Sequence, residues 1–380
     1  MSTQTPAPDV VRKTRKRKKK GGVGRFFRRL FLLIFTIVFL LVGCLCMVLN
    51  TVFNGPSEAA RNVLTMSLTE ASATKWVPGL FLGDELVAQI RDKSGTALEE
   101  AFSDASQVVI NKDNALSASD EWKDWPDGIR IESYKGDTYN AHIMIIRDPA
   151  QVYMATSTDG PFSTSVPGTR IHNEIETEGA IAAINAGAFN DDGSANAYVG
   201  SIPAGLLMVD GEVRSNSFHE LVPESGFAGF TFDNVLVVAK SMTAEKAKEL
   251  NIRDGCEFGP VLIMNGEVNQ EAYNANSGYN PRTAIGQRAD GAVIFLCIDG
   301  RQASSLGATY RDVIDIMVEF GAVNACNMDG GSSTVMMYLD SAGRYGTAGE
   351  YVMINSYSLL QSEPRRMPNF WMVRPAGQEG

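Results

Sequence analysis

In the stretch Asn327–Tyr338, NMDGGSSTVMMY, a turn rich in glycine and serine with one carboxylate joins two apolar runs. The preceding run, VNACNM (323–328), is predicted as a strand, and TVMMYL (334–339) as the next strand. Asp329 is then expected at a strand end, where an exposed turn meets a packed sheet and sites are often built. A hairpin would explain Asp-Gly, but it does not explain Gly-Ser-Ser-Thr.

The segments around this stretch predict a sheet with few helices. TYRDVIDIMVEFGA (309–322) has an apolar stripe at helical spacing, with Thr309 to cap it and a glycine to end it. MTAEKAKELN (242–251) and residues 83–102 also have helical spacing. Residues 103–128 are polar and rich in turns, so we expect no long element there.

Alternation and turn chemistry predict strands over most of the remaining chain. Residues 129–156 alternate between apolar and polar side chains and are rich in β-branched residues. LLMVDGEV (206–213) and LIMNGEV (262–268) each place Asp-Gly or Asn-Gly between apolar and polar runs, and RADGAVIFLCIDG (288–300) adds a third pair. Such pairs tolerate the positive φ of a type I′ hairpin. We therefore predict an α+β fold with a mixed, largely antiparallel sheet core and few helices.

One N-terminal segment is predicted to cross a membrane. Leu30–Leu49, LFLLIFTIVFLLVGCLCMVL, is 20 residues long without a charge, which spans ~30 Å as a helix. A cleaved signal peptide is the alternative, but the apolar run is too long and no A-x-A-like site follows. The basic cluster before the segment keeps the N-terminus cytoplasmic and the body extracytoplasmic. The predicted organisation is a basic tail (1–29), an anchor (30–49), a stalk or membrane-proximal region (50–125) and a single domain (126–376).

Charge and cysteine content exclude two classes of protein. Of 34 basic and 44 acidic residues, eleven basic residues and one acidic residue lie in 1–49, so the rest of the chain has a net charge of −20. Such an acidic body is a poor partner for nucleic acid. The body has three cysteines, Cys256, Cys297 and Cys326, whose spacing fits no zinc pattern. We expect free buried thiols rather than a disulfide framework.

Several candidate site residues fall near predicted strand ends. AAINAGAFNDDG (182–193) places Asn185 in an apolar strand, where its amide needs a hydrogen-bond partner. SGYNPRTAIGQ (277–287) brings Arg282, whose planar fork suits phosphate or carboxylate, and FLCIDGRQ (295–302) ends in Asp299. His172, His219 and Glu220 fall in segments that resemble loops and are more often structural than catalytic.

The motifs of four large enzyme classes are missing. The sequence contains no GxSxG, HExxH, GxxxxGK[ST] or GxGxxG after a strand, which argues against serine hydrolases, zinc proteases, P-loop NTPases and dinucleotide enzymes. Ser332 or Ser333 remains a candidate nucleophile, but local sequence places no base beside either one.

Taken together, five segments resemble the phosphodiester glycosidase family. They are INAGAFNDDG (184–193), GPVLIMNGEV (259–268), NPRTAIGQRADGAVIFLCIDGR (280–301), ATYRDVIDIMVEFGAVNACNMDGGSSTVMMY (308–338) and EPRRMPNFWMV (363–373). The resemblance covers about residues 126–376, in the order of the family. One motif reads Asn-Ala-Gly-Ala-Phe where the family pattern has Asn-Gly-Gly-Phe-Phe.

The resemblance implies a hydrolase that cuts the bond between the anomeric carbon of a sugar and a phosphodiester oxygen. The leaving group is a phosphate monoester with a second pKa of about 6, so it needs less acid catalysis than an ordinary glycoside. Asp329 is then the expected base or nucleophile and Asp299 the second carboxylate, which orients water or holds a cation. The expected substrate- and phosphate-binding residues are Arg282, Thr283, Asn185, Gly187, Asn327, Gly330, Gly331, Ser332 and Ser333. Among these, backbone N–H groups of 330–332 would form an anion-binding nest.

The implied substrate is a sugar-phosphate polymer or glycan of the envelope or an exported polysaccharide. The predicted partners are this polymer and, through residues 30–49, a lipid bilayer, with no nucleic acid. The sequence requires no cofactor, although a divalent cation is compatible with it. Two alternatives stay open: a non-catalytic glycan-binding or scaffolding module, and a metal-dependent phosphodiesterase that cuts the P–O bond.

Overall fold

A computed structural model describes residues 22–69, 74–92, 102–108, 122–190, 199–219, 222, 226–357 and 363–377. The chain divides into two units, Met1–Gly55 and Pro56–Gly380. The described part of the first unit is helix α1 (Gly22–Phe53). Within it, Phe26–Phe53 is long and apolar enough to cross a membrane, with a mean hydropathy of 3.1 in its most apolar window. The same property is found in signal sequences.

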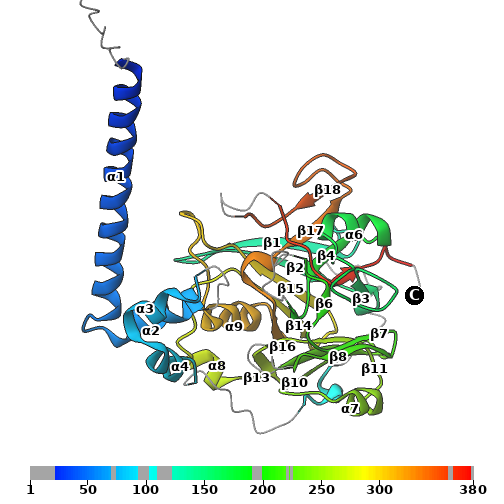
Figure 1. Ribbon diagram of the computed structural model, residues 1–380. Coiled ribbons are helices and arrows are strands. Elements are labelled where there is room, and N and C mark those ends of the chain that lie inside the picture. The colour runs from blue at the N-terminus through cyan, green and yellow to red at the C-terminus, as the bar shows by residue number, and fades with distance from the viewer. Residues whose placement is uncertain are drawn as a thin grey trace, which may run out of the picture. The chain divides into compact units, whose positions relative to one another are not determined.

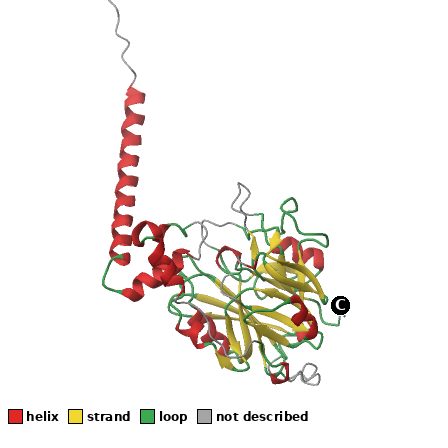
Figure 2. Ribbon diagram, turned by 60° about the horizontal axis from the view of Figure 1, so that its bottom comes forward, coloured by secondary structure: helices red, strands yellow, loops and turns green. Residues whose placement is uncertain are grey.

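Antiparallel strands form the centre of the second unit, with helices around them (Figures 1 and 2). Sheet I has seven strands in the order β1 (Ile129–Lys135), β2 (Asn140–Ile146), β15 (Val293–Ile298), β14 (Arg282–Arg288), β16 (Ala322–Met328), β12 (Val261–Met264) and β13 (Glu267–Val268). Sheet II has the order β10 (Leu236–Ala239), β9 (Phe227–Thr231), β11 (Ile252–Glu257), β7 (Gly205–Val209) and β8 (Glu212–Ser217). Sheet III has the order β18 (Glu350–Met353), β17 (Met336–Asp340), β4 (Ala182–Asn185), β19 (Asn369–Val373) and β3 (Val152–Thr156). A short pair, β5 (Phe189–Asn190) and β6 (Ile202–Pro203), stands apart.

The α-helices in the described part of the second unit are short. They are α2 (Glu58–Thr69), α3 (Val77–Leu82), α4 (Asp84–Asp92), α6 (Ile171–Glu178), α7 (Ala244–Glu249), α8 (Gln270–Asn274) and α9 (Tyr310–Glu319). Helix α9 begins with the predicted cap, because Thr309 and Asp312 form a reciprocal capping box. Gly321, which follows its end, has a φ of +82°. These elements confirm the predicted α+β class with few helices.

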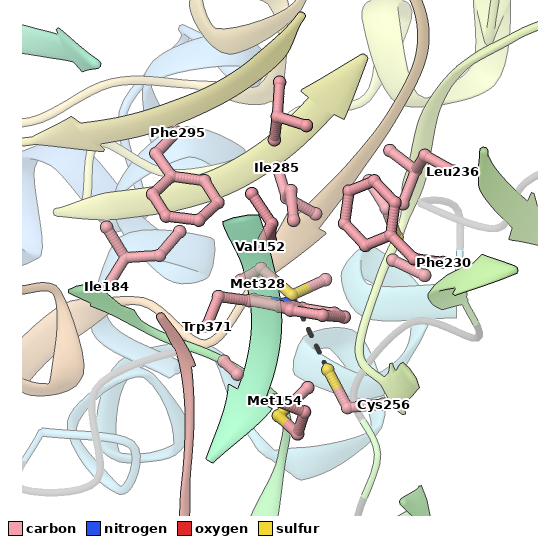
Figure 3. Packing of buried hydrophobic residues seen from close by; sticks show 14 of the residues in the cluster. Val152, Met154, Ile184, Phe230, Leu236, Cys256, Ile285, Phe295, Met328 and Trp371 are labelled. Carbon is pink, nitrogen blue, oxygen red and sulfur yellow. Dashed lines mark hydrogen bonds between the residues drawn. The ribbon is translucent and has the colours of Figure 1, made fainter. Parts of the chain in front are cut away.

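One apolar core lies among the three sheets (Figure 3). Trp371 of sheet III packs edge-on against Phe230 of sheet II, with ring centroids 5.6 Å apart. The side chains of β15, in the centre of sheet I, are buried on both faces: Phe295 faces this core, while Leu296 faces a second cluster with α9. Burial on both faces explains why β15 is a continuous apolar run rather than an alternating one.

Two of the predicted hairpins form with the expected turn, while the third, at Asp290-Gly291, joins the paired strands β14 and β15 with positive φ at the glycine alone. Asp210 and Gly211, between β7 and β8, have φ values of +49° and +78°. Asn265 and Gly266, between β12 and β13, have φ values of +54° and +78°. The thiols of Cys256, Cys297 and Cys326 are free and buried, also as expected.

The stretch NMDGGSST does not join paired strands. Strand β16 belongs to sheet I and β17 to sheet III, so Asp329–Val335 carries the chain from one sheet to the other. Its middle forms a 3₁₀ turn over Gly331–Ser333. The glycine-rich sequence is needed because this crossing passes close to other backbone: a Cβ on Gly330 would lie 2.7 Å from the Pro281 carbonyl oxygen.

Residues 58–92, predicted as a stalk or membrane-proximal region, contain helices that pack within the second unit. Helix α2 buries Asn62, Thr65 and Met66. It also lies against the loop before β14, where the N–H of Tyr279 donates to Ser67 Oγ at 2.9 Å. A Cβ on Gly278 would lie only 2.3 Å from the Ser67 backbone nitrogen. The weak periodicity of this sequence gave no sign of the contact.

Candidate functional site

Asn185 holds together three elements at the meeting point of sheets I and III. Its amide donates to the carbonyl oxygen of Asp329 at 2.5 Å. Its Oδ1 accepts from Thr283 Oγ1 at 2.9 Å and from the Val335 N–H at 3.1 Å. Both Asn185 and Thr283 are completely buried. The amide of Asn185, buried in an apolar strand, therefore finds its hydrogen-bond partners within the protein.

The backbone of Asp329 is fixed on both sides. Its N–H donates to the Ala186 carbonyl at 3.0 Å, and its own carbonyl accepts from Asn185. The residue remains partly exposed, unlike the buried Met328 before it. The backbone of this partly exposed acidic residue is therefore fixed at the sheet junction.

Asp299 lies directly after β15 and is 3% exposed. Its Oδ1 accepts from the Ser356 N–H at 2.8 Å, and its Oδ2 accepts from Ser356 Oγ at 2.7 Å. His142 Nε2, from the neighbouring strand β2, lies 3.4 Å from Oδ2. The Asp299 carboxylate is thus held rigidly by two residues that sequence reasoning missed. A histidine inside the apolar strand AHIMII was the available signal for one of them, but the pairing of β2 with β15 could not be read from the sequence.

A small hollow brings Asp299 and the glycine-rich turn together. It is lined by Pro281 and by residues of the segments 298–301, 331–334 and 355–357. Asp299, Gly331 and Ser332 are the predicted site residues in this lining. Tyr357 also lines it, and burial raises the pKa of its phenol well above the usual value. Polar groups therefore converge on one spot from both sheets.

Gly331 has the positive φ that the proposed nest requires, at +61°, whereas Gly330 is extended at −115°. The N–H of Gly331 donates to the Pro281 carbonyl at 2.9 Å. This N–H is therefore occupied by the protein. Of the three N–H donors expected to bind an anion (330–332), the N–H of Gly331 is therefore used to stabilise the turn.

Two arginines that were not predicted lie beside this turn. A terminal nitrogen of Arg301 is 3.2 Å from the position that a Cβ on Gly331 would occupy, and Arg365 Nη1 is 3.5 Å from Ser332 Oγ. Arg301 lines the hollow in a left-handed conformation, with a φ of +57°. Such a backbone is unfavourable for a residue with a side chain and is found preferentially at functional sites. In the sequence, Asp299-Gly300-Arg301 and the segment EPRRMPNF (363–370) could have indicated these two arginines.

Arg282 has another environment. Its guanidinium donates to the carbonyl oxygens of Gly278 at 2.8 Å and Ala308 at 3.1 Å. It also lies over the ring of Tyr310, 4.3 Å from the centroid, and is 5% exposed. In this structure, Arg282 fixes the loop that leads to Pro281.

The remaining predicted residues, Asn327, Gly187 and Ser333, are buried. Asn327 is 1% exposed and donates to the Gly259 carbonyl at 2.8 Å. Gly187 donates to Asn369 Oδ1 at 2.7 Å, and a Cβ there would lie 2.8 Å from Cys256 Cβ. Ser333 is 1% exposed, and its buried hydroxyl has no hydrogen-bond partner in the structure.

The other histidines lie elsewhere. His172, expected in a loop, lies in α6, which ends at Gly179 with a φ of +63°. His219 bonds to Glu257 away from the hollow, and Glu220 lies outside the described residues. Among the described residues, no group of three or more His, Cys, Asp or Glu side chains is arranged to hold a metal ion.

Comparisons with known proteins show the family of the chain. The model of the phosphodiester glycosidase family matches residues 178–374, just over half of the sequence. The uncharacterized SPbeta prophage-derived protein YomE of Bacillus subtilis is 42% identical over 85 residues, which are 22% of this chain and 13% of that protein. The chain therefore matches only about an eighth of that relative's length.

Three solved structures are similar at low identity. One is the catalytic domain of zebrafish N-acetylglucosamine-1-phosphodiester alpha-N-acetylglucosaminidase, auto-inhibited by its pro-peptide, at 19% identity and a TM-score of 0.48, over 65% of this chain and 82% of that one. A hypothetical protein from Synechocystis has 15% identity and a TM-score of 0.44, over 65% and 61%. A putative exported protein from Burkholderia pseudomallei has 15% identity and a TM-score of 0.41, over 62% and 74%.

Proposed function

Because this chain belongs to the phosphodiester glycosidase family, we propose that it hydrolyses the glycosidic C–O bond of sugar-1-phosphodiesters in an envelope or exported polysaccharide. The observation that carries the proposal is the hollow at the sheet junction. It combines Asp299 with the turn Gly331–Ser333, and both belong to the segment that matches the family. Two arginines beside the same turn supply positive charge for an anionic substrate.

The phosphate is the group for which Arg301 and Arg365 are suited. Guanidinium groups bind phosphate oxygens through paired, charge-assisted hydrogen bonds. Their positions beside Gly331 and Ser332 would hold the leaving phosphate against the 3₁₀ turn. Arg282, expected in this role, would act indirectly through the loop that it holds with Gly278 and Ala308.

The two carboxylates would have different roles. Asp329 is partly exposed on a fixed backbone, which suits the base or nucleophile at the anomeric carbon. Asp299 is buried and bonded by Ser356 and near His142, which suits a residue that orients its neighbours. In hydrolysis, the phosphate monoester leaves with the electron pair of the C–O bond and the oxygen of water joins the sugar. The leaving group is a good one, so one reactive carboxylate suffices where an ordinary glycoside needs two.

The membrane anchor belongs to the same proposal. Helix α1 is long and apolar enough to span a bilayer, and the preceding run of basic residues favours a cytoplasmic N-terminus. Resistance to extraction at alkaline pH, together with digestion of the body by protease added to intact cells, is the expected result for this topology. A mature N-terminus located beyond residue 49 would show a cleaved signal peptide instead.

The reaction is tested with the full chain in detergent micelles and a panel of sugar-1-phosphodiesters. The expected products are a free reducing sugar and a phosphate monoester. In ¹⁸O-labelled water the label should enter the sugar. Label in the phosphate would show P–O cleavage and overturn the proposal in favour of a phosphodiesterase, and a parallel reaction with a chelator tests for a cation.

A further inference from the structure

A second cavity, larger than the hollow at the sheet junction, opens at one end of the strands of sheet II. It measures about 440 Å³, within the range of small-molecule sites. Its lining comes from the end of β8 and the residues after it, from the segment that follows β10 and from the end of β11, because these three strands finish at the same end of sheet II. None of its lining residues belongs to the hollow around Asp299.

A buried carboxylate forms part of the wall of this cavity. Glu257 is 8% exposed, and its Oε2 lies 3.0 Å from His219 Nδ1. The other ring nitrogen, Nε2, lies 2.9 Å from Asn216 Oδ1. Burial raises the pKa of Glu257, while the hydrogen bond from His219 opposes this rise. A carboxylate, an imidazole and an amide are thus held in one row along the wall.

The backbone makes room for this carboxylate. Gly205 has a φ of +77°, and a Cβ there would lie 2.3 Å from Glu257 Oε2. A side chain at position 205 would therefore displace Glu257 from the wall. Burial of a carboxylate is unfavourable for folding. The position of Glu257 at a cavity, in space that Gly205 leaves open, therefore points to a role in binding a ligand rather than in stabilising the fold.

The remaining lining indicates the chemistry of the ligand. Lys240, Glu245 and Glu257 bring charges of both signs, which favours a neutral ligand over a polyanion. Val222 and Met242 add an apolar surface beside the polar row. A sugar ring fits this pattern, because its hydroxyl groups both donate and accept hydrogen bonds while its C–H face packs on apolar side chains.

The cavity is connected with the proposed catalytic site through one short segment. The N–H of Ala188 donates to the Glu257 carbonyl at 3.0 Å, and the carbonyl of Ala186 accepts from the Asp329 N–H at 3.0 Å. Residues 186–188 therefore contact both Glu257 and Asp329. We propose that the cavity around Glu257, His219 and Asn216 binds a neutral sugar unit of the polymer, separate from the unit whose phosphodiester is cut. The choice of a sugar among neutral ligands rests on the proposed function.

Binding is measured without turnover, by saturation-transfer NMR on the full chain in detergent micelles. The probes are glucose, galactose, mannose and N-acetylglucosamine at 10 mM, with sorbitol as an acyclic control. We expect at least one ring sugar to bind, and Glu257→Gln or Ser241→Trp to weaken it at least tenfold. Ser241 is exposed at the cavity, so its replacement blocks the space without disturbing a buried group.

Two control variants separate this inference from the proposed reaction. Asp299→Asn should keep sugar binding, because the residue belongs to the other hollow, and His172→Ala on α6 should also keep it. No binding of any ring sugar, or binding unchanged by both Glu257→Gln and Ser241→Trp, would overturn the inference. Failure of the hydrolysis assay with intact, Ser241-sensitive sugar binding would overturn only the proposed reaction.

Discussion

Two kinds of Asx-Gly turn in this molecule begin with the same local chemistry and end differently. At Asp210-Gly211 and Asn265-Gly266 both residues have positive φ, and the flanking strands pair with each other. At Asp329-Gly330-Gly331 only the last residue has positive φ, and the flanking strands belong to different sheets. The difference shows that at these turns the contacts of the next residues, and not the Asx-Gly pair alone, decide which strand follows.

The largest expected effect is that of Asp329→Asn compared with Asp210→Asn. Both changes remove one charge beside a glycine, and Asn tolerates the left-handed conformation that Asp210 adopts. If Asp329 is the reacting carboxylate, hydrolysis should fall on the order of 10³-fold, whereas Asp210→Asn should leave the rate within about twofold. The measurement is kcat/KM on a sugar-1-phosphodiester, with the melting temperature as a folding control. Full activity in a folded Asp329→Asn protein would remove Asp329 from the mechanism.

The next largest expected effect is the loss of activity in Gly331→Val, compared with Gly266→Val. Both glycines have positive φ, so each substitution should destabilise the fold by ~1–3 kcal/mol. Only at Gly331 would the new side chain approach Arg301, at 3.2 Å, whereas a Cβ on Gly266 meets nothing within 4 Å. We expect a loss of activity on the order of 100-fold at Gly331 alone. Equal losses of activity in the two variants would mean that the turn matters only for folding.

Arg301→Gln compared with Arg288→Gln tests the charge beside the turn. Arg288 bonds to Asp290 in a hairpin, whereas Arg301 lines the hollow. Loss of a charge-assisted contact to phosphate should raise KM about tenfold for Arg301→Gln, and the raised KM should depend less on salt. Arg288→Gln should change neither quantity. An unchanged KM in Arg301→Gln would leave Arg365 as the proposed phosphate ligand.

The smallest effect concerns Glu174, on α6 and away from either kind of turn. Burial, together with the neighbouring Glu178, raises its pKa from 4.5 to about 7. The folded state therefore favours the neutral carboxyl, and this contribution to stability is lost as pH rises through about 7. Glu174→Gln should flatten the fall in stability between pH 5 and pH 8 and stabilise the protein at pH 8 by ~1 kcal/mol after allowance for solvent screening. Denaturant unfolding at both values measures it, and an unchanged pH dependence would contradict it.

The sequence predicts well what local chemistry decides. The hairpins at Asp210 and Asn265 and the capped helix after Thr309 follow from neighbouring residues alone, and the structure confirms them. The position of Asp299 at a strand end follows in the same way.

Contacts between distant segments could not be predicted. His142 and Asp299 are 157 residues apart, and they meet only because β2 pairs with β15. The direction of the Arg282 side chain depends on the carbonyl groups of Gly278 and Ala308. The composition and the hydrophobic periodicity of a sequence do not show which strands become neighbours. They therefore cannot predict contacts between distant side chains.

If α1 anchors the protein in a membrane and the body is the hydrolase proposed above, the contact between Gly278 and α2 has a consequence for release of that body. Ser67 supports the loop that leads to Arg282 and Pro281. A protease that cuts between α1 and α2, at residues 54–57, would shed a body in which this loop is still supported. A cut after α2 would shed a body without that support. Where the cleavage falls would therefore decide whether shedding spreads the activity into the medium or ends it.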